Sequence, residues 1–484
     1  MIRQLLPRLA AALLILCALP ASSETPVAEA QAAGRQAVYD AFREEFDAGR
    51  FDAALPLART LVELFETQAP DSDQLPTAYN NLGAVQWRTG DLAGAQASFS
   101  RALELLERTQ GISSRRLIAP LAGLATVYAE QGQHDLAADT LQRAIAVNRR
   151  AEGLFNLDQL ELLEPLLRSY EAMGALDGVE RELRYMLQVV RKRYGADDPR
   201  TLPATTRLAV LYEKTRHYPA ARALWGQSAR IGSREGGGRN AATINGLLGI
   251  ARTHRLQFVH QPESLVEQVP IDPFTGKPDP LGSAGMRAGP VKLDDEGEEA
   301  ALEALEILDG TPDPPRALLG AALLELGDWY TTAREPGRAA PYYERAWPAL
   351  QESLVPGESH PLAVPRPLSY RVPAMASRQR LSPDLRTVAL RMEFSLAIAA
   401  TGEVTSVAVA SSEADESQAA QVRRALERAW FSPRFEDGRA VPAEGFLFTE
   451  YWHDIAPPEP EAEAPPAETG EGREPDPTAA KPGA

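Results

Sequence analysis

Apolar residues recur along much of the chain with a helical spacing, and the whole pattern repeats about every 42 residues. Between roughly residues 77 and 230, apolar positions three and four residues apart form one stripe on each of two successive helices per repeat. Glycine suits the turn between them, because the residue after a helix end often adopts a left-handed conformation. The turns fall at Gly49, Gly90, Gly132, Gly174 and Arg216, which are 41, 42, 42 and 42 residues apart. The pattern predicts helical hairpins stacked into a solenoid.

The residue types inside each hairpin indicate how its helices pack. Small residues let two antiparallel helices approach closely, and the pattern combines them with aromatic and aliphatic positions. The set includes Tyr79, Leu82, Gly83, Ala95, Phe99, Ala102, Ala125, Ala137 and Ala221. It resembles the tetratricopeptide repeat (TPR). The period is longer than the usual length of about 34 residues and, with the asparagine pair before Leu82, resembles the long-loop repeats of kinesin light chains.

We expect such repeats over residues 37–350, in about six units. The first unit, at 37–66, is atypical because Phe42 stands at a small-residue position, which suits a capping repeat. A later unit at 316–350 is out of phase with the others, since 118 residues separate Arg216 from Arg334.

A proline- and glycine-rich insertion interrupts this pattern at residues 259–296. A first helix at 244–258 and a second at 297–308 flank it. A loop of this length inside a compact array is either a disordered decoration or a lid over the neighbouring surface.

The hydrophobic period changes near the C-terminus to the period of two that is typical of a half-buried strand. Prolines punctuate residues 351–386, which favours an extended connector. Apolar residues then alternate from Val388 to Ile398, a second strand is expected at 404–410, and a helix follows at 415–430. A last strand is expected from Phe446 to Trp452. The expected fold is therefore mostly α, a TPR-like solenoid followed by a small α+β domain.

This small domain, residues 387–453, resembles the TonB C-terminal domain. The likeness rests on the order of its elements, on Phe431-Ser432-Pro433 after the helix and on the Gly438 to Pro442 segment before the last strand. In that family the domain lies in the periplasm of Gram-negative bacteria and binds a short peptide of an outer-membrane transporter. The resemblance implies that a partner strand pairs with a sheet edge, formed here by Phe446–Trp452. TonB itself has an N-terminal anchor and a proline-rich spacer instead of helical repeats, so only the docking role is expected.

The first 23 residues read as a secretory signal peptide. Arg3 and Arg8 precede an apolar run from Leu9 to Leu19, and the small residues Pro20 to Ser23 follow it. The run is far shorter than the roughly 20 residues that cross a bilayer, and no later segment approaches that length. We therefore expect cleavage after Ser23, a periplasmic location and no stable membrane span in the mature form.

Charge and composition narrow the possible functions. The 484 residues include 50 Lys and Arg against 67 Asp and Glu, a net charge of −17, so the cationic surface that nucleic acids require is absent overall. The segment 454–484 is rich in proline and acidic residues and cannot bury enough apolar surface to fold. We expect a disordered acidic tail there, or alternatively an acidic docking segment.

The residue types that perform catalysis or bind metals do not converge in this sequence. The single cysteine, Cys17, lies within the signal peptide, and His254 and His260 are off the spacing of a helical metal pair. The glycine-rich segment 233–240 lacks the end of a phosphate loop and predicts a hinge. We expect no enzyme activity, no metal and no cofactor. A hydrolase hidden within 259–296 is the remaining alternative.

Partner binding is expected on the concave face, which the first helices of tetratricopeptide arrays line, and on the last strand. Carboxylates outnumber cations at the helical positions, which favours a partner with a basic or amide-rich surface; the alternative is a merely solvated helix face. Trp87 favours binding, because a large exposed aromatic ring is normally covered. The candidates are Asn80, Trp87, Arg88, Glu130, Glu164, Arg168, Glu171, Glu213, Phe446, Phe448, Glu450 and Trp452.

These features predict a non-enzymatic periplasmic adaptor that binds proteins or peptides, including envelope or outer-membrane proteins, through its groove and its TonB-like domain. The alternative is a TonB-type energy transducer that retains its N-terminal segment as an anchor. N-terminal sequencing separates the two, because a mature chain that begins near Glu24 has lost the anchor.

Overall fold

A computed structural model describes residues 26–235, 238–260, 293, 295–373 and 387–455. The chain divides into two compact units, residues 1–361 and 362–484. The first is a helical solenoid and the second contains a small antiparallel sheet, as the sequence predicts. The expected signal peptide, most of the 259–296 insertion and residues 456–484 of the expected tail lie outside the described residues.

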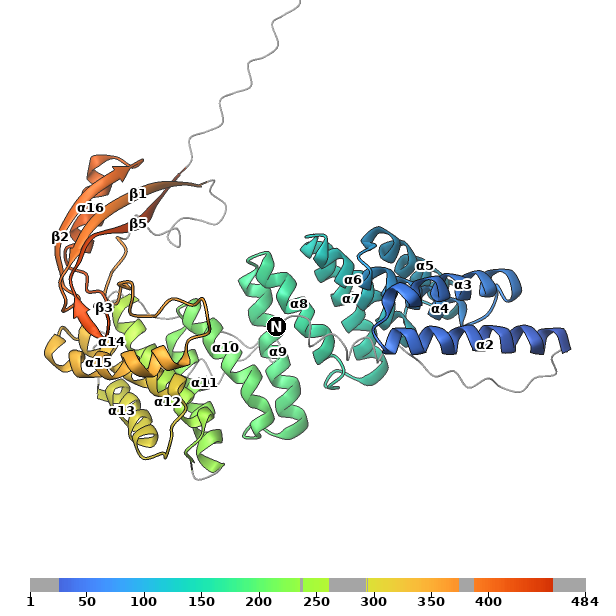
Figure 1. The fold of residues 1–484 in the computed structure, drawn as a ribbon, viewed down its shortest axis with the longest axis horizontal. Coiled ribbons are helices and arrows are strands. Elements are labelled where there is room, and N and C mark those ends of the chain that lie inside the picture. The colour runs from blue at the N-terminus through green and yellow to red at the C-terminus, as the bar shows by residue number, and fades with distance from the viewer. Residues whose placement is uncertain (1–25, 236–237, 261–292, 294, 374–386, 456–484) are drawn as a thin grey trace, which may run out of the picture. The chain divides into compact units, whose positions relative to one another are not determined.

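Helices α2 to α15 form seven consecutive antiparallel pairs within the described part of the first unit, stacked side by side (Figure 1). About six had been expected. The pairs are α2 (Pro26–Asp47) with α3 (Phe51–Gln68), α4 (Leu75–Arg88) with α5 (Leu92–Gln110), α6 (Ile118–Glu130) with α7 (His134–Glu152), α8 (Leu160–Ala172) with α9 (Leu176–Tyr194), α10 (Leu202–Lys214) with α11 (Tyr218–Arg234), α12 (Ala241–His260) with α13 (Asp295–Asp309), and α14 (Arg316–Thr332) with α15 (Pro336–Ser353). Short 3₁₀ helices, η2 (Arg115–Leu117) and η3 (Pro199–Thr201), precede α6 and α10.

The turn inside six of these seven pairs has the left-handed conformation that the glycine spacing predicts, and the segment between α12 and α13 lies outside the described residues. The φ angles are 73° at Gly49, 86° at Gly90, 76° at Gly132 and 67° at Gly174. Arg216 occupies the same conformation with φ 64°, and Arg334 repeats it with φ 63° in the out-of-phase last pair. The turn geometry is therefore kept even where the sequence has arginine in place of glycine.

Small residues allow the close helix packing that the sequence predicts. A Cβ added to Gly83 would lie 2.9 Å from the Phe99 ring, and one added to Gly123 would lie 2.5 Å from it. The last pair repeats this arrangement, since a Cβ on Gly327 would lie 2.6 Å from Tyr343. Each of these aromatic rings thus packs directly on the backbone of a neighbouring helix.

The second unit is a three-stranded antiparallel sheet in the order β2–β1–β5, with a separate hairpin of β3 and β4. Its elements are β1 (Thr387–Ile398), β2 (Val404–Ser412), α16 (Glu416–Leu426), β3 (Arg434–Glu436), β4 (Arg439–Val441) and β5 (Ala443–Ile455). The alternation predicted for β1 is confirmed: Met392, Phe394 and Leu396 are buried in a cluster with Val422 and Leu426 of α16. The helix ends at Leu426, four residues earlier than expected.

Part of the expected connector is packed into this second unit. The Leu368 N–H donates to the Trp430 carbonyl at 2.8 Å, and the Ser432 N–H donates to the Arg366 carbonyl at 2.8 Å. Tyr370 is buried against the strands. Residues 362–370 contain no helix, as the prolines predict, but they form turns, bends and one isolated bridge instead of an extended connector, and they pack into the core of this unit.

Candidate functional site

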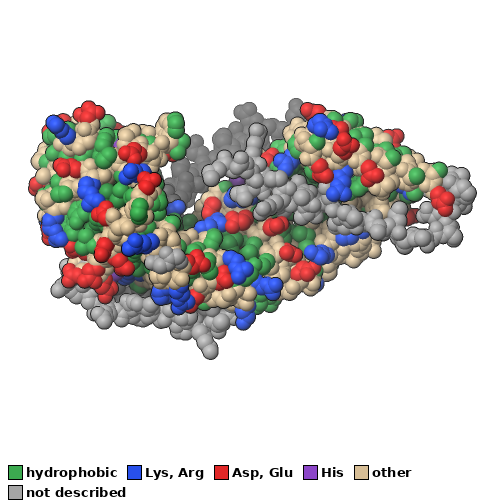
Figure 2. Space-filling model, turned by 60° about the horizontal axis from the view of Figure 1, so that its bottom comes forward, with side chains coloured by type: hydrophobic (Ala, Val, Ile, Leu, Met, Phe, Trp, Pro, Cys, Tyr) green, Lys and Arg blue, Asp and Glu red, His purple; other side chains and the backbone are tan. Residues whose placement is uncertain are grey.

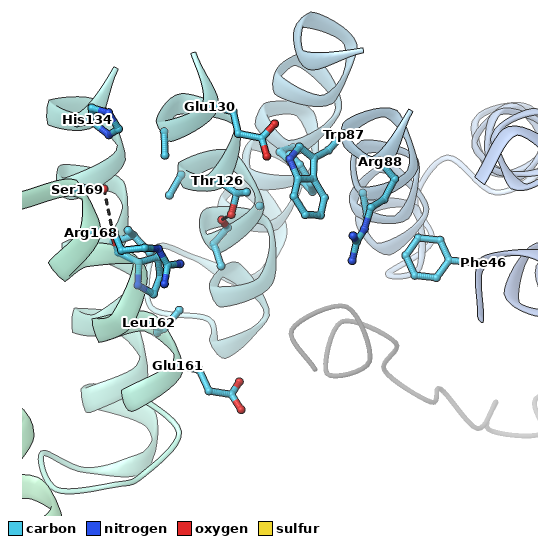
Figure 3. Close-up of a pocket in the computed structure, with 18 residues that line it drawn as sticks. Phe46, Trp87, Arg88, Thr126, Glu130, His134, Glu161, Leu162, Arg168 and Ser169 are labelled. Carbon is cyan, nitrogen blue, oxygen red and sulfur yellow. Dashed lines mark hydrogen bonds between the residues drawn. The ribbon is translucent and has the colours of Figure 1, made fainter. Parts of the chain in front are cut away.

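A cavity of 280 Å³ opens among the first helices of three successive repeats, α4, α6 and α8 (Figure 3). Its walls carry Trp87 and Arg88 from α4 and Pro165 and Arg168 from α8. Phe46, at the end of α2, also contributes to the lining. The cavity is thus built from the helices that the tetratricopeptide resemblance places on the concave face.

Small side chains of α6 create the hollow. Ala122, Gly123, Ala125 and Ala129 line it, and Phe99 lies against Gly123 from the neighbouring repeat. Larger residues at these positions would fill the space between α4 and α8. The same small-residue pattern that lets helices approach closely therefore leaves room for a guest on the groove side.

Two hydrogen-bond donors in the wall are shielded from solvent without a partner among the described residues, Trp87 Nε1 and Arg88 Nε. The Arg88 guanidinium lies 4.5 Å from the Trp87 ring centroid and 5.3 Å from that of Phe51. Burial lowers the pKa of Arg88, and the charge of Glu130 acts in the opposite direction. Both donors are desolvated, a state that costs about 1–3 kcal/mol for each unpaired group.

Some of the other polar groups of the cavity already have a hydrogen-bond partner within the described residues, and His134 does not. The Thr126 hydroxyl donates to the Ala122 carbonyl at 2.9 Å, and the Ser169 hydroxyl donates to the Pro165 carbonyl at 3.1 Å. His134 Nδ1 is shielded from solvent and has no partner in the described part of the chain. The place of His134 in this cavity was not foreseen from the sequence.

Four of the helical candidates meet at this cavity: Trp87, Arg88, Glu130 and Arg168 (Figure 3). Asn80 does not, because only 4% of it is exposed. The structure therefore buries Asn80, which the sequence analysis had placed at a groove-facing position. Whether the other four contact a partner stays a prediction.

Arginines of the following repeat neutralise most of the remaining candidates. Arg207 Nη1 lies 2.7 and 2.8 Å from the two carboxylate oxygens of Glu164. Arg207 Nη2 lies 3.8 Å from the Glu171 carboxylate. Arg252 donates two hydrogen bonds to Glu213, at 2.9 and 3.1 Å. Glu213 also accepts from Trp225 Nε1 at 2.6 Å.

The expected acidic character of the groove is therefore corrected. Sequence reasoning counted the carboxylates but missed Arg207 and Arg252, which lie 43 and 39 residues after their partners, about one repeat period. The signal in the sequence that could have revealed these ion pairs was an arginine about one repeat period after each glutamate. Basic and acidic side chains are correspondingly interspersed on the face of the molecule in Figure 2.

The last-strand candidates lie on β5, which pairs only with β1 among the described strands and so forms a sheet edge. Their side chains face inward. Trp452 is 4% exposed, and the Phe448 ring packs 5.3 Å from Tyr370 and 5.9 Å from Phe431. Phe446 is half-buried in the same core, and Glu450 adds its charge to the burial that raises the pKa of Tyr370. The part of this strand left open at the sheet edge is therefore its backbone, and its contact with a partner strand stays a prediction.

The direction of that edge backbone follows from β1. The Arg391 carbonyl accepts from the Glu413 N–H at 2.9 Å, and the Arg391 N–H donates to the Glu413 side chain at 2.7 Å, so both groups face the β2 side. Successive residues of a strand direct these groups to opposite sides. The backbone N–H and C=O groups of Met392 and Phe394 therefore point to β5. Those of their partners Glu450 and Phe448 point back to β1. Thr449 and Tyr451 direct their N–H and C=O groups to the open edge, where the Tyr451 N–H donates to the Glu450 carboxylate at 3.0 Å.

Comparison with known proteins identifies the repeats. A family model described as tetratricopeptide repeat matches residues 45–108 and 74–150. Among solved structures, TPR-like repeats described as a kinesin light chain from Podosopora anserina match at 17% identity over 42% of this chain and 96% of that chain, with a TM-score of 0.37. A tetratricopeptide repeat protein from Parabacteroides merdae matches at 15% identity over 67% of this chain and 94% of that chain, with a TM-score of 0.33. A TPR repeat-containing protein from Cytophaga hutchinsonii matches at 14% identity over 67% and 96%, with a TM-score of 0.38.

No curated protein matches the chain. The family model confirms tetratricopeptide repeats, and such repeats indicate a scaffold for protein–protein interaction. Within the described residues, no helix is both long and apolar enough to cross a bilayer. The same residues contain no cluster of side chains suited to a metal ion.

Proposed function

We propose that this chain is an adaptor of the Gram-negative periplasm that holds one partner in its solenoid groove and a second at the edge of its small domain. The single observation that carries the scaffold role is the cavity on α4, α6 and α8, because it lies on the face that tetratricopeptide arrays use for their partners. The envelope location rests on the signal-like residues 1–23 and on the resemblance of residues 387–453 to the TonB C-terminal domain.

The open β5 edge supports a docking role for the small domain. An extended peptide that adds a strand there would pair with the outward N–H and C=O groups of Thr449 and with the C=O of Tyr451. The Tyr451 N–H donates to the Glu450 carboxylate at 3.0 Å and would exchange that partner for the added strand. Beside that edge, the side chains of Leu447 and Tyr451 are 61% and 45% exposed and offer apolar surface to the added strand.

The test replaces Thr449 with proline, which removes one edge-facing donor. Proline is tolerated in an edge strand where its missing N–H faces solvent, and Thr449 is exposed, so the fold should persist. Phe448→Pro is the matched comparison, because it breaks the ladder with β1 and the core together. Site-specific photocrosslinking from Tyr451 in intact cells, followed by mass spectrometry, identifies the partner.

We expect Thr449→Pro to abolish the Tyr451 crosslink while circular dichroism and thermal unfolding stay close to wild type. Phe448→Pro should lose the crosslink and the folded domain together. A persistent crosslink in Thr449→Pro would exclude strand addition at this edge. N-terminal sequencing of the same preparation decides the location: a start near Glu24 supports the adaptor, and an intact Met1 supports the anchored transducer.

A further inference from the structure

We propose that one edge of the solenoid docks on the surface of an anionic lipid bilayer. This basic edge consists of the ends of α5, α7 and α9 and the loops that follow these helices, residues 108–116, 149–158 and 191–200. The inference goes beyond the proposed adaptor function, because it does not depend on what the groove or the β5 edge binds.

The basic edge is cationic in a chain that is otherwise acidic. Its three segments carry nine Lys and Arg against four Asp and Glu, whereas the whole chain has 50 against 67. One cation recurs every 42 residues near the ends of α5, α7, α9 and α11: Arg108, Arg150, Lys192 and Arg234. At physiological ionic strength, exposed charges more than about 8 Å apart are largely screened from each other. A surface that meets this edge therefore experiences the edge's own charge rather than the net charge of the chain.

Large apolar side chains project from the same edge. Ile112 is 70% exposed, and Leu154, which stands 42 residues later, is 60% exposed. Phe155 beside it is 36% exposed. The loop after α9 has Ala196 and Asp197 at the positions of Leu154 and Phe155. The loop conformation therefore does not require a large apolar residue at these positions.

Contacts between repeats bring the segments together. The Arg150 guanidinium donates to the Ser113 hydroxyl, so the end of α7 contacts the loop after α5. The Tyr185 hydroxyl of α9 donates to the Leu154 carbonyl, so α9 contacts the loop after α7. The exposed apolar residues and the cations thus belong to one continuous surface.

Two cations of the basic edge are available to a partner. In the following repeat, Arg234 Nη1 pairs with the Asp197 carboxylate at 2.6 Å. The equivalent position opposite Lys192 is Phe155, whose side chain accepts no hydrogen bond. Lys192 and Arg193 are exposed and have no ion pair within the described residues. Cations in the last turn of a helix complement its dipole, but this effect does not account for the exposed apolar side chains beside them.

A bilayer surface matches both features of the edge. Anionic headgroups attract exposed Lys and Arg, and apolar side chains reach the boundary between headgroups and acyl chains. Nucleic acids and anionic polysaccharides supply the charge without an apolar phase. A protein partner needs a complementary surface for the projecting loops, whereas a fluid bilayer admits them without a preformed hollow.

The experiment measures sedimentation of the purified full chain with phosphatidylcholine vesicles, either pure or containing about one third phosphatidylglycerol. At about 0.1 M NaCl we expect binding to the anionic vesicles, and roughly tenfold weaker partition into neutral vesicles or at about 1 M NaCl. Lys192→Gln with Arg193→Gln should weaken partition into the anionic vesicles roughly 20-fold. Ile112→Ser with Leu154→Ser should weaken it roughly tenfold.

Matched controls make the same changes elsewhere in the solenoid. Arg43→Gln with Arg59→Gln removes two exposed cations from α2 and α3. Leu136→Ser with Leu176→Ser removes leucines that are 42% and 50% exposed in the first turns of α7 and α9, at the opposite ends of these helices. Neither control should change partition by more than about twofold. Residues 1–23 are the same in every variant, so their apolar run contributes equally to all measurements.

Three results would overturn the proposal. The anionic vesicles fail to bind the chain, or bind it no better than neutral vesicles do. The edge variants partition as the control variants do. Sedimentation velocity without vesicles shows self-association that Lys192→Gln with Arg193→Gln abolishes, which would assign the edge to a second copy of this chain. None of these results changes the Tyr451 crosslink, so the adaptor function is tested separately.

Discussion

Arg216 shows how much a single backbone position matters to the repeat. It stands where Gly49, Gly90, Gly132 and Gly174 turn the chain between helices, and it keeps their left-handed φ at 64°. This conformation costs a residue with a Cβ roughly 1–2 kcal/mol more than it costs glycine, which in turn loses more entropy on folding. Packing of the flanking helices therefore holds Arg216 in a conformation that its own residue type disfavours.

Replacing Arg216 with glycine should therefore stabilise the chain by about 0.5–1 kcal/mol. The free energy of unfolding, measured by urea titration at pH 7, checks this. The reciprocal change Gly132→Arg, at φ 76°, should destabilise by a similar amount. If Arg216→Gly were neutral and Gly132→Arg were tolerated, the turn would not impose the strain described here.

The same substitution should change the response to acid. Burial, together with the charges of Arg216 and Arg255, lowers the pKa of His260 to about 4. The unfolded chain takes up this proton near pH 6.5, so stability is lost as the pH falls from about 6.5 towards 4. Without Arg216 the pKa should rise and that loss should shrink. Arg334→Gly is the matched control, because it relaxes the same turn conformation, at φ 63°, without adding a charge effect on His260.

At the scale of elements, a buried ion cluster joins α12 to α14 across the 261–292 segment. Arg255 donates to the two oxygens of Glu325 at 2.7 and 3.0 Å and lies 3.7 Å from Asp328, which accepts from the Tyr343 hydroxyl at 2.9 Å. Burial opposes the charge of Arg255, but the charges of Glu325 and Asp328 outweigh it and raise its pKa. The cluster fixes the register of two helices that are distant in sequence.

Arg255→Met should destabilise the chain by about 3–5 kcal/mol, because it leaves the buried Glu325 carboxylate without its ion-pair partner. Adding Glu325→Met should recover much of this loss, since Asp328 keeps its bond from Tyr343. Urea unfolding measures both. Arg316→Met removes the exposed pair with Glu352 and should change stability by less than about 1 kcal/mol. A double variant no more stable than the single one would mean that lost packing, rather than unpaired charge, sets the cost.

The elements that the sequence predicts well are those set by local periodicity. The helix pairs and their turns follow from stripes and glycines that recur at a fixed period, and the alternation of β1 follows from one buried face. The period of the apolar residues does not reveal which charged side chains form ion pairs between repeats. The pairs Glu164–Arg207 and Glu213–Arg252 depend on how far each repeat rotates against the next. For the same reason, the cavity beside Trp87 required three helices in place before it could be seen.

At the scale of the whole chain, the two units have separate hydrophobic cores. One cluster, around Phe99, Leu121 and Leu163, lies within the repeats, and another, around Phe394 and Phe431, lies within residues 370–452. In a repeat array each unit contacts only its neighbours, so stability is approximately a sum of local terms. A small sheet domain with its own core instead unfolds as one cooperative step.

A core substitution in either unit should therefore lower the stability of that unit alone. Phe394→Ala removes a fully buried ring and should destabilise the sheet unit by about 3–5 kcal/mol. Leu121→Ala, at a position 1% exposed, should cost about 2–5 kcal/mol in the repeats around α6. Hydrogen exchange followed by mass spectrometry resolves the two: Phe394→Ala should speed exchange in residues 387–455 and leave α4 to α9 protected, and Leu121→Ala should do the reverse. If either substitution accelerated exchange equally throughout, the chain would fold as one cooperative body, and its two binding surfaces could not be varied independently.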